Sequence, residues 1–101
     1  MRVCAAFIPE IIEESGKKAI YRVLDDAEFK EYLEKKLDEE VAEFHESKSI
    51  EEIADIVEVL MALIKEYGFD DYTVHENRWS KKVKLGGFNK RICLLEVEGV
   101  K

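Results

Sequence analysis

The spacing of apolar side chains predicts two long helices at the centre of the chain. In residues 26–46 the apolar positions recur every three or four residues, which places them on one side of a helix. These positions are Phe29, Leu33, Leu37, Val41 and Phe44. Asp25 or Asp26 is a suitable N-cap, so the first long helix is expected to begin there.

The second long helix follows a short turn. Ser49 and Glu52 have the spacing of a capping box, and the apolar pattern then continues to Gly68. Within residues 56–64 only Glu58 is charged, which predicts a helix at the buried centre of the protein. A chain of 101 residues cannot easily surround such a helix, so we expect a homodimer or homotetramer.

Shorter elements are expected around this pair. A short helix should begin near Pro9 and end at a glycine, and another helix should span residues 71–84. Residues 19–24 and 92–97 are rich in β-branched side chains and are predicted to pair as two strands against the helices. The expected fold is therefore a mainly α, antiparallel helical domain over residues 1–101, with a small two-stranded β element.

Composition excludes several classes of protein. The net charge of −7 argues against a general nucleic-acid binder, because binding a phosphate backbone requires a basic surface. The longest apolar run contains two acids and is shorter than the roughly 20 residues of a membrane span. Cys4 and Cys93 suggest neither a disulfide framework nor a zinc site, so we expect a cytoplasmic protein. Abundant charge without glutamine is typical of thermophile proteins.

Four carboxylates are predicted to meet at one end of the long helices. Glu40 and Glu43 lie late on the first helix, and Glu52 and Asp55 lie early on the second, which runs antiparallel to it. Glu40 falls within the apolar stripe, where an ionised carboxylate without a partner costs several kcal/mol. This placement favours a bound cation over a solvated acidic face, and oxygen ligands favour Mg²⁺ or Mn²⁺.

These acids also carry a family resemblance. Glu39-Glu40-x-x-Glu43 followed by Glu52-x-x-Asp55 resembles the EExxE and ExxD signature of the MazG-like nucleotide pyrophosphohydrolases. That superfamily also contains phosphoribosyl-ATP pyrophosphohydrolase and the all-helical dUTPases. The chain resembles a small single-domain branch of it over nearly its whole length, although of the basic stretch that precedes Ile-Pro-Glu in that branch it keeps little more than Arg2.

The resemblance implies an all-α NTP pyrophosphatase that uses Mg²⁺. Glu40, Glu43, Glu52 and Asp55 would hold the ion, and Glu39 would orient or deprotonate the attacking water. Attack near the α-phosphorus would release pyrophosphate and a nucleoside monophosphate. A basic cluster near the C-terminal end would balance the phosphate charge. Its members are Arg78, Lys81, Lys82, Lys84 and Arg91.

Two other functions remain open at this point. Hydrolysis of phosphoribosyl-ATP would use the same chemistry and differ only in the pocket for the base and sugar, where Tyr72, Trp79 or Phe88 could stack. The second alternative is a non-catalytic, nucleotide-binding helical oligomerisation module. The altered N-terminal stretch favours this module, whereas the five signature acids oppose it.

Overall fold

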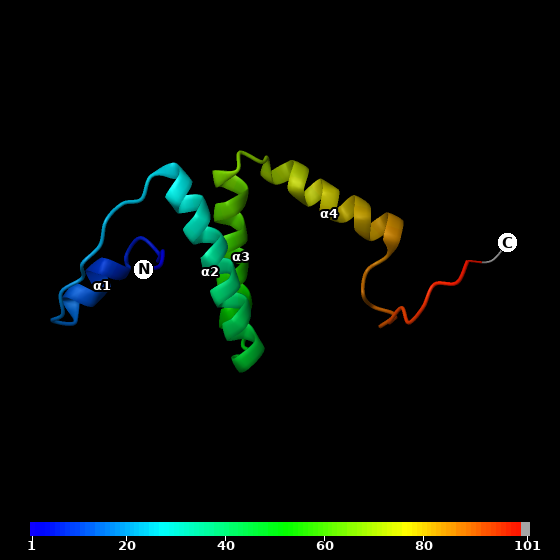
Figure 1. Ribbon diagram of the computed structural model, residues 1–101, viewed down its shortest axis with the longest axis horizontal. Helices are drawn as coiled ribbons and strands as arrows, with labels where there is room; N and C mark the ends of the chain where they lie inside the picture. The colour runs from blue at the N-terminus through cyan, green and yellow to red at the C-terminus, as the bar shows by residue number, and fades with distance from the viewer. Residues whose placement is uncertain (100–101) are drawn as a thin grey trace. The chain divides into compact units, whose positions relative to one another are not determined.

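The computed structural model describes residues 1–99, and the last two residues of the predicted 1–101 domain lie outside that range. Within it the chain forms four helices (Figure 1). They are α1 (Ile8–Glu14), α2 (Asp26–Ser47), α3 (Ile50–Glu66) and α4 (Asp71–Leu85). The predicted mainly α fold is confirmed. The chain divides into two compact units, the first spanning Met1–Asp70 and the second beginning at Asp71.

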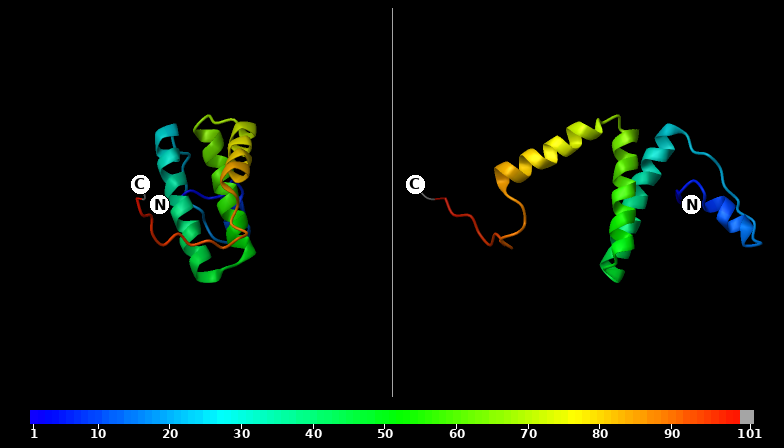
Figure 2. Two further views of the ribbon diagram at one scale, coloured as in Figure 1. Left: turned by 90° about the vertical axis from the view of Figure 1, so that its right-hand side faces the viewer. Right: turned by 180° about the vertical axis from the view of Figure 1, so that it is seen from behind.

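Helices α2 and α3 form the predicted antiparallel pair and lie side by side (Figures 1 and 2). The Asp25 side chain caps α2 by accepting the Glu28 N–H at 2.9 Å. The Ser49 hydroxyl caps α3 by accepting the Glu52 N–H at 3.4 Å. Between the helices, Lys48 takes a left-handed conformation with φ 54°, which ends α2 and reverses the chain within two residues.

The core between these helices is narrow, and within a single chain α3 is not the buried centre that its sequence predicts. Leu33 and Val59 are buried, with 5% and 8% of their surface exposed. On another side of α3, Val57 and Leu60 remain 51% and 43% exposed. Within the first unit α2 alone packs against α3, and one neighbouring helix can cover only one face.

The predicted two-stranded element is not confirmed, because residues 1–99 contain no strand. The segment 19–24 is irregular, and the side chains of Ile20 and Val23 are each 90% exposed. Arg22 ties this segment to the first turn of α2 through two contacts with Glu28, at 2.6 and 3.1 Å. A lone ribbon is marginal in water, and β-branched composition without an apolar surface to cover does not stabilise one.

The remaining helices agree with the sequence. Helix α1 begins next to Pro9 and is followed by Gly16, whose φ of +89° is accessible to glycine without strain. Helix α3 ends at Glu66 with Tyr67 as its C-cap, and Gly68 follows with φ +73°. Helix α4 buries none of its residues. In the part of the chain that is described, no helix combines the length and apolar character that crossing a bilayer requires.

Candidate metal centre

The five predicted acids come together where the end of α2 lies beside the beginning of α3. Their carboxylate oxygens form two overlapping groups, and within each group the oxygens lie within 4.8 Å of one another. One group is Glu39, Glu40 and Glu43, and the other is Glu40, Glu52 and Asp55. Glu40 belongs to both groups, so a single buried side chain links the acids of the two helices.

Glu40 is the most deeply buried charged residue in the described chain, with 4% of its surface exposed. Its Oε1 lies 3.2 Å from the Lys36 ammonium. Its Oε2 is buried and has no hydrogen-bond partner, and the same is true of Glu52 Oε2. An unsatisfied buried acceptor costs about 1–3 kcal/mol, and more when it is charged. Each of these two oxygens can therefore still accept a hydrogen bond or bind a positive species.

The titration behaviour of the pair follows from the same geometry. Hydrogen bonding to Glu40, burial and the neighbouring Glu43 together raise the pKa of Glu52 to about 7. Burial pushes the pKa of Glu40 upward, but hydrogen bonds from Glu52 and Lys36 outweigh it and lower the pKa overall. Near neutral pH a proton on Glu52 can thus be shared with Glu40. A divalent cation would satisfy both oxygens in place of that proton.

Two basic residues that were not predicted as part of the site contact the acids directly. Arg2 Nη1 donates to Glu39 Oε1 at 2.6 Å, and Lys36 Nζ lies 3.4 Å from the same oxygen. Burial lowers the pKa of Lys36, but Glu40 and Glu39 outweigh this and raise it. Lys36 precedes these two acids by four and three residues, a helical spacing that could have revealed it. Arg2 is 37 residues from Glu39, so no local pattern points to it.

The predicted phosphate-binding residues belong to the second unit. Arg78, Lys81, Lys82 and Lys84 lie on α4 and Arg91 follows it, and all five are exposed. The Lys82 ammonium lies 5.5 Å from the centre of the Trp79 ring, a cation–π contact. Arg91 has a φ of 59° and donates its N–H to the Phe88 carbonyl at 3.1 Å. Their role toward phosphate stays a prediction.

Comparison of the chain with protein-family models, with curated proteins and with solved structures found no match. The resemblance to MazG-like pyrophosphohydrolases therefore stays a prediction. The functional argument depends on the acid cluster itself, whose all-oxygen donor set suits a hard divalent cation. The two buried oxygens without a hydrogen-bond partner, one on Glu40 and one on Glu52, are the observation that best fits such an ion.

Proposed function

We propose that the chain is a Mg²⁺-dependent nucleotide pyrophosphohydrolase that cleaves a nucleoside triphosphate to the monophosphate and pyrophosphate. The observation that carries the proposal is the buried Glu40 carboxylate, whose Oε2 has no partner among four further acids. Buried charges in proteins are paired or coordinate a metal. A divalent cation would give both buried oxygens a partner, as the shared proton does for the Glu40–Glu52 pair in its absence.

In this proposal each acid has a distinct task. Glu40, Glu43, Glu52 and Asp55 hold the ion, with Mn²⁺ as a possible substitute. When bound, the ion supplies charge neutralisation at the phosphates and a more acidic water. Glu39 orients the attacking water, and Arg2 and Lys36 fix the direction of its carboxylate through their contacts with Oε1.

The direct test is pyrophosphate release from a panel of nucleotides that includes phosphoribosyl-ATP, with and without Mg²⁺. We expect Glu40→Gln to lower kcat by on the order of 100-fold, because the shared ligand of both acid groups loses its charge. Glu58→Gln is the matched control, since Glu58 is an exposed acid of α3 that belongs to neither group. It should leave kcat within about twofold.

Each outcome of the panel selects one function. Release from nucleoside triphosphates that is lost in Glu40→Gln supports the proposal. Release of pyrophosphate from phosphoribosyl-ATP alone would favour the alternative function, a phosphoribosyl-ATP pyrophosphohydrolase. Nucleotide binding without release from any substrate would favour the non-catalytic module, and release that Glu40→Gln does not reduce would contradict the assigned site.

The proposal includes a homodimer or homotetramer, supported by the exposed face of α3. Ile53, Val57 and Leu60 are 45%, 51% and 43% exposed, and their spacing of four and three residues is that of helices that pair. Light scattering after size exclusion should therefore give an oligomer at micromolar concentration. Val57→Asp should shift it toward monomer, whereas Ile92→Asp, at a residue 80% exposed outside α3, should not. A monomeric native chain would contradict this part.

A further inference from the structure

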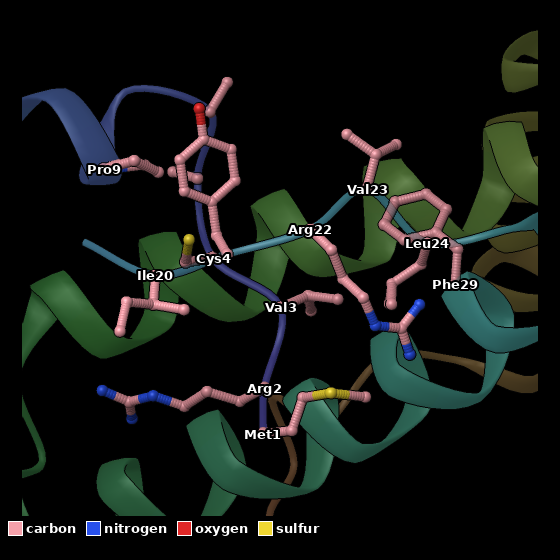
Figure 3. A pocket seen from close by; sticks show the side chains of 13 residues that line it. Met1, Arg2, Val3, Cys4, Pro9, Ile20, Arg22, Val23, Leu24 and Phe29 are labelled. Carbon is pink, nitrogen blue, oxygen red and sulfur yellow. The ribbon is translucent and has the colours of Figure 1, made fainter.

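A cavity of about 760 Å³ lies in the first unit, separate from the acid cluster. Its walls come from the N-terminal segment, from residues 20–24 and from the first turn of α2, which contributes Phe29 (Figure 3). The N-terminal segment that carries Met1 to Cys4 crosses the segment that carries Ile20 and Arg22. The volume lies within the range of small-molecule sites, which is about 300–1,000 Å³.

The chemistry of the walls suits a flat, largely apolar group. Most of the lining is aliphatic or aromatic, with Ile20, Tyr21 and Phe29 among its members, and no acid lines it. Of its two arginines, Arg22 is already paired with Glu28 on α2. The other arginine, Arg2, is paired with Glu39, which does not line the cavity.

Arg2 joins this cavity to the candidate metal centre. It lines the cavity, and its Nη1 donates to Glu39 Oε1 at 2.6 Å. A guanidinium has five N–H donors in a planar fork that matches phosphate oxygens, so the contact with Glu39 leaves donors for another anion. A molecule with an apolar ring at one end and phosphates at the other would extend from the cavity past Arg2 to the acids.

We propose that this cavity binds the nucleoside part of a nucleotide whose phosphates reach the acid cluster, with Arg2 positioned between the two. The inference depends on the proposed function and deepens it by assigning the pocket for base and sugar. It places base recognition on residues 20–24, Phe29 and the N-terminal segment. This location differs from the stacking by Tyr72, Trp79 or Phe88 that the sequence suggested.

The first test measures binding without turnover. Amide chemical shifts of the full chain are followed while adenosine 5′-monophosphate or 2′-deoxyuridine 5′-monophosphate is added in the presence of Mg²⁺. We expect the largest changes at residues 2–6, 20–24 and 29 for at least one of these probes. Changes concentrated at Tyr72, Trp79 and Phe88, or no change with either probe, would overturn the inference.

The second test enlarges side chains that line the cavity and leaves the acids unchanged. Ile20→Trp and Val23→Trp alter lining residues that are each 90% exposed, so neither should impair folding. We expect each variant to raise KM for the preferred nucleotide about tenfold with kcat within twofold, and to reduce the shift changes described above. Hydrolysis of inorganic triphosphate, which has no nucleoside, should be unaffected. Ile92→Trp is the control, because Ile92 is similarly exposed and does not line the cavity.

The two tests separate the failure of this inference from the failure of the proposed function. If no nucleotide is hydrolysed but the shift changes map to the cavity and are lost in Ile20→Trp, the cavity is a nucleotide site and the enzyme proposal is wrong. If nucleotides are hydrolysed with an unchanged KM in both tryptophan variants, the enzyme proposal stands and the cavity assignment is wrong.

Discussion

The acidic end of the α2–α3 pair and the basic α4 are both dense in charge, but they differ in how their charged side chains are held. The acids come from two helices that a two-residue turn joins in antiparallel order, so their oxygens lie within 4.8 Å of one another. The bases of α4 follow one another along a single helix that buries none of its residues. Charge density alone therefore does not indicate a site, whereas convergence of charges on a packed interface does.

The packing behind each region explains the difference. Leu33 and Val59 are buried where α2 packs against α3 and hold the two helices together. The position of Glu40, about two turns after Leu33 on α2, is therefore also held. On α4 the larger apolar side chains are exposed, including Trp79 at 57% and Val83 at 70%. No side chain of α4 is held in a buried core as Leu33 and Val59 are.

The largest expected effect is on the free energy of unfolding. Leu33→Ala should lower it by about 2–5 kcal/mol, because it removes the more deeply buried of the two core side chains. Val83→Ala should change it by no more than about 0.5 kcal/mol, because Val83 is largely exposed. Urea denaturation followed by circular dichroism measures both. Equal losses would show that α4 is as tightly packed as the helix pair and would remove the contrast between the regions.

Features set by neighbouring residues could be predicted from the sequence, whereas contacts between distant residues could not. The N-caps at Asp25 and Ser49 and the apolar spacing fixed the bounds of α2 and α3 to within a residue or two, because these signals act within a few positions. The burial of Glu40 followed from its place in the stripe. N-caps and apolar spacing do not predict contacts between residues that lie far apart in the sequence. The Arg2–Glu39 ion pair was missed, and the segment 19–24 was wrongly assigned to a strand.

The second expected effect is stabilisation of the acid cluster by a divalent cation. For an ion that binds only the folded chain, a Mg²⁺ concentration of 100 times Kd should raise the free energy of unfolding by about 2.7 kcal/mol. Glu40→Gln should abolish most of the gain. Thermal melts in MgCl₂ measure the effect. Melts in NaCl of equal ionic strength are the control, because Na⁺ and Cl⁻ screen exposed charges such as those of α4 but are not expected to bind between the acids. If NaCl raises the free energy of unfolding by the same amount, the stabilisation is due to screening of charges and not to a bound divalent cation.

The third expected effect is a pH dependence that the acid cluster has and α4 lacks. The pKa of Glu52 is about 7 in the folded chain against 4.5 in the unfolded chain, so the folded state binds more protons between these values. Stability in the absence of metal should therefore fall as pH rises from about 4.5 to about 7. The lowered pKa of Glu40 acts with the opposite sign, and only below about 4.5.

Melting temperatures of the metal-free chain across this pH range test the sign. Glu52→Gln should flatten the profile, whereas Glu58→Gln should keep it, because Glu58 lies outside both acid groups. Saturating Mg²⁺ should also flatten the native profile, since the ion replaces the proton between Glu40 and Glu52. A melting temperature that rises with pH over this window would contradict the shared-proton arrangement.

The smallest expected effect concerns the bases of α4. Lys81→Ala should raise KM for a nucleoside triphosphate about threefold with little change in kcat, because an exposed lysine contributes only about 0.2–1 kcal/mol to an ionic contact. The rise should shrink in 0.5 M NaCl, where exposed charges are screened within a few ångströms. Lys17→Ala removes an equally exposed charge from the first unit and serves as the control. If both variants raise KM alike, the effect reflects net charge rather than position, and α4 has no specific part in binding phosphate. If Lys81→Ala alone does so, the basic helix contributes to the site despite lacking the convergence that distinguishes the acids.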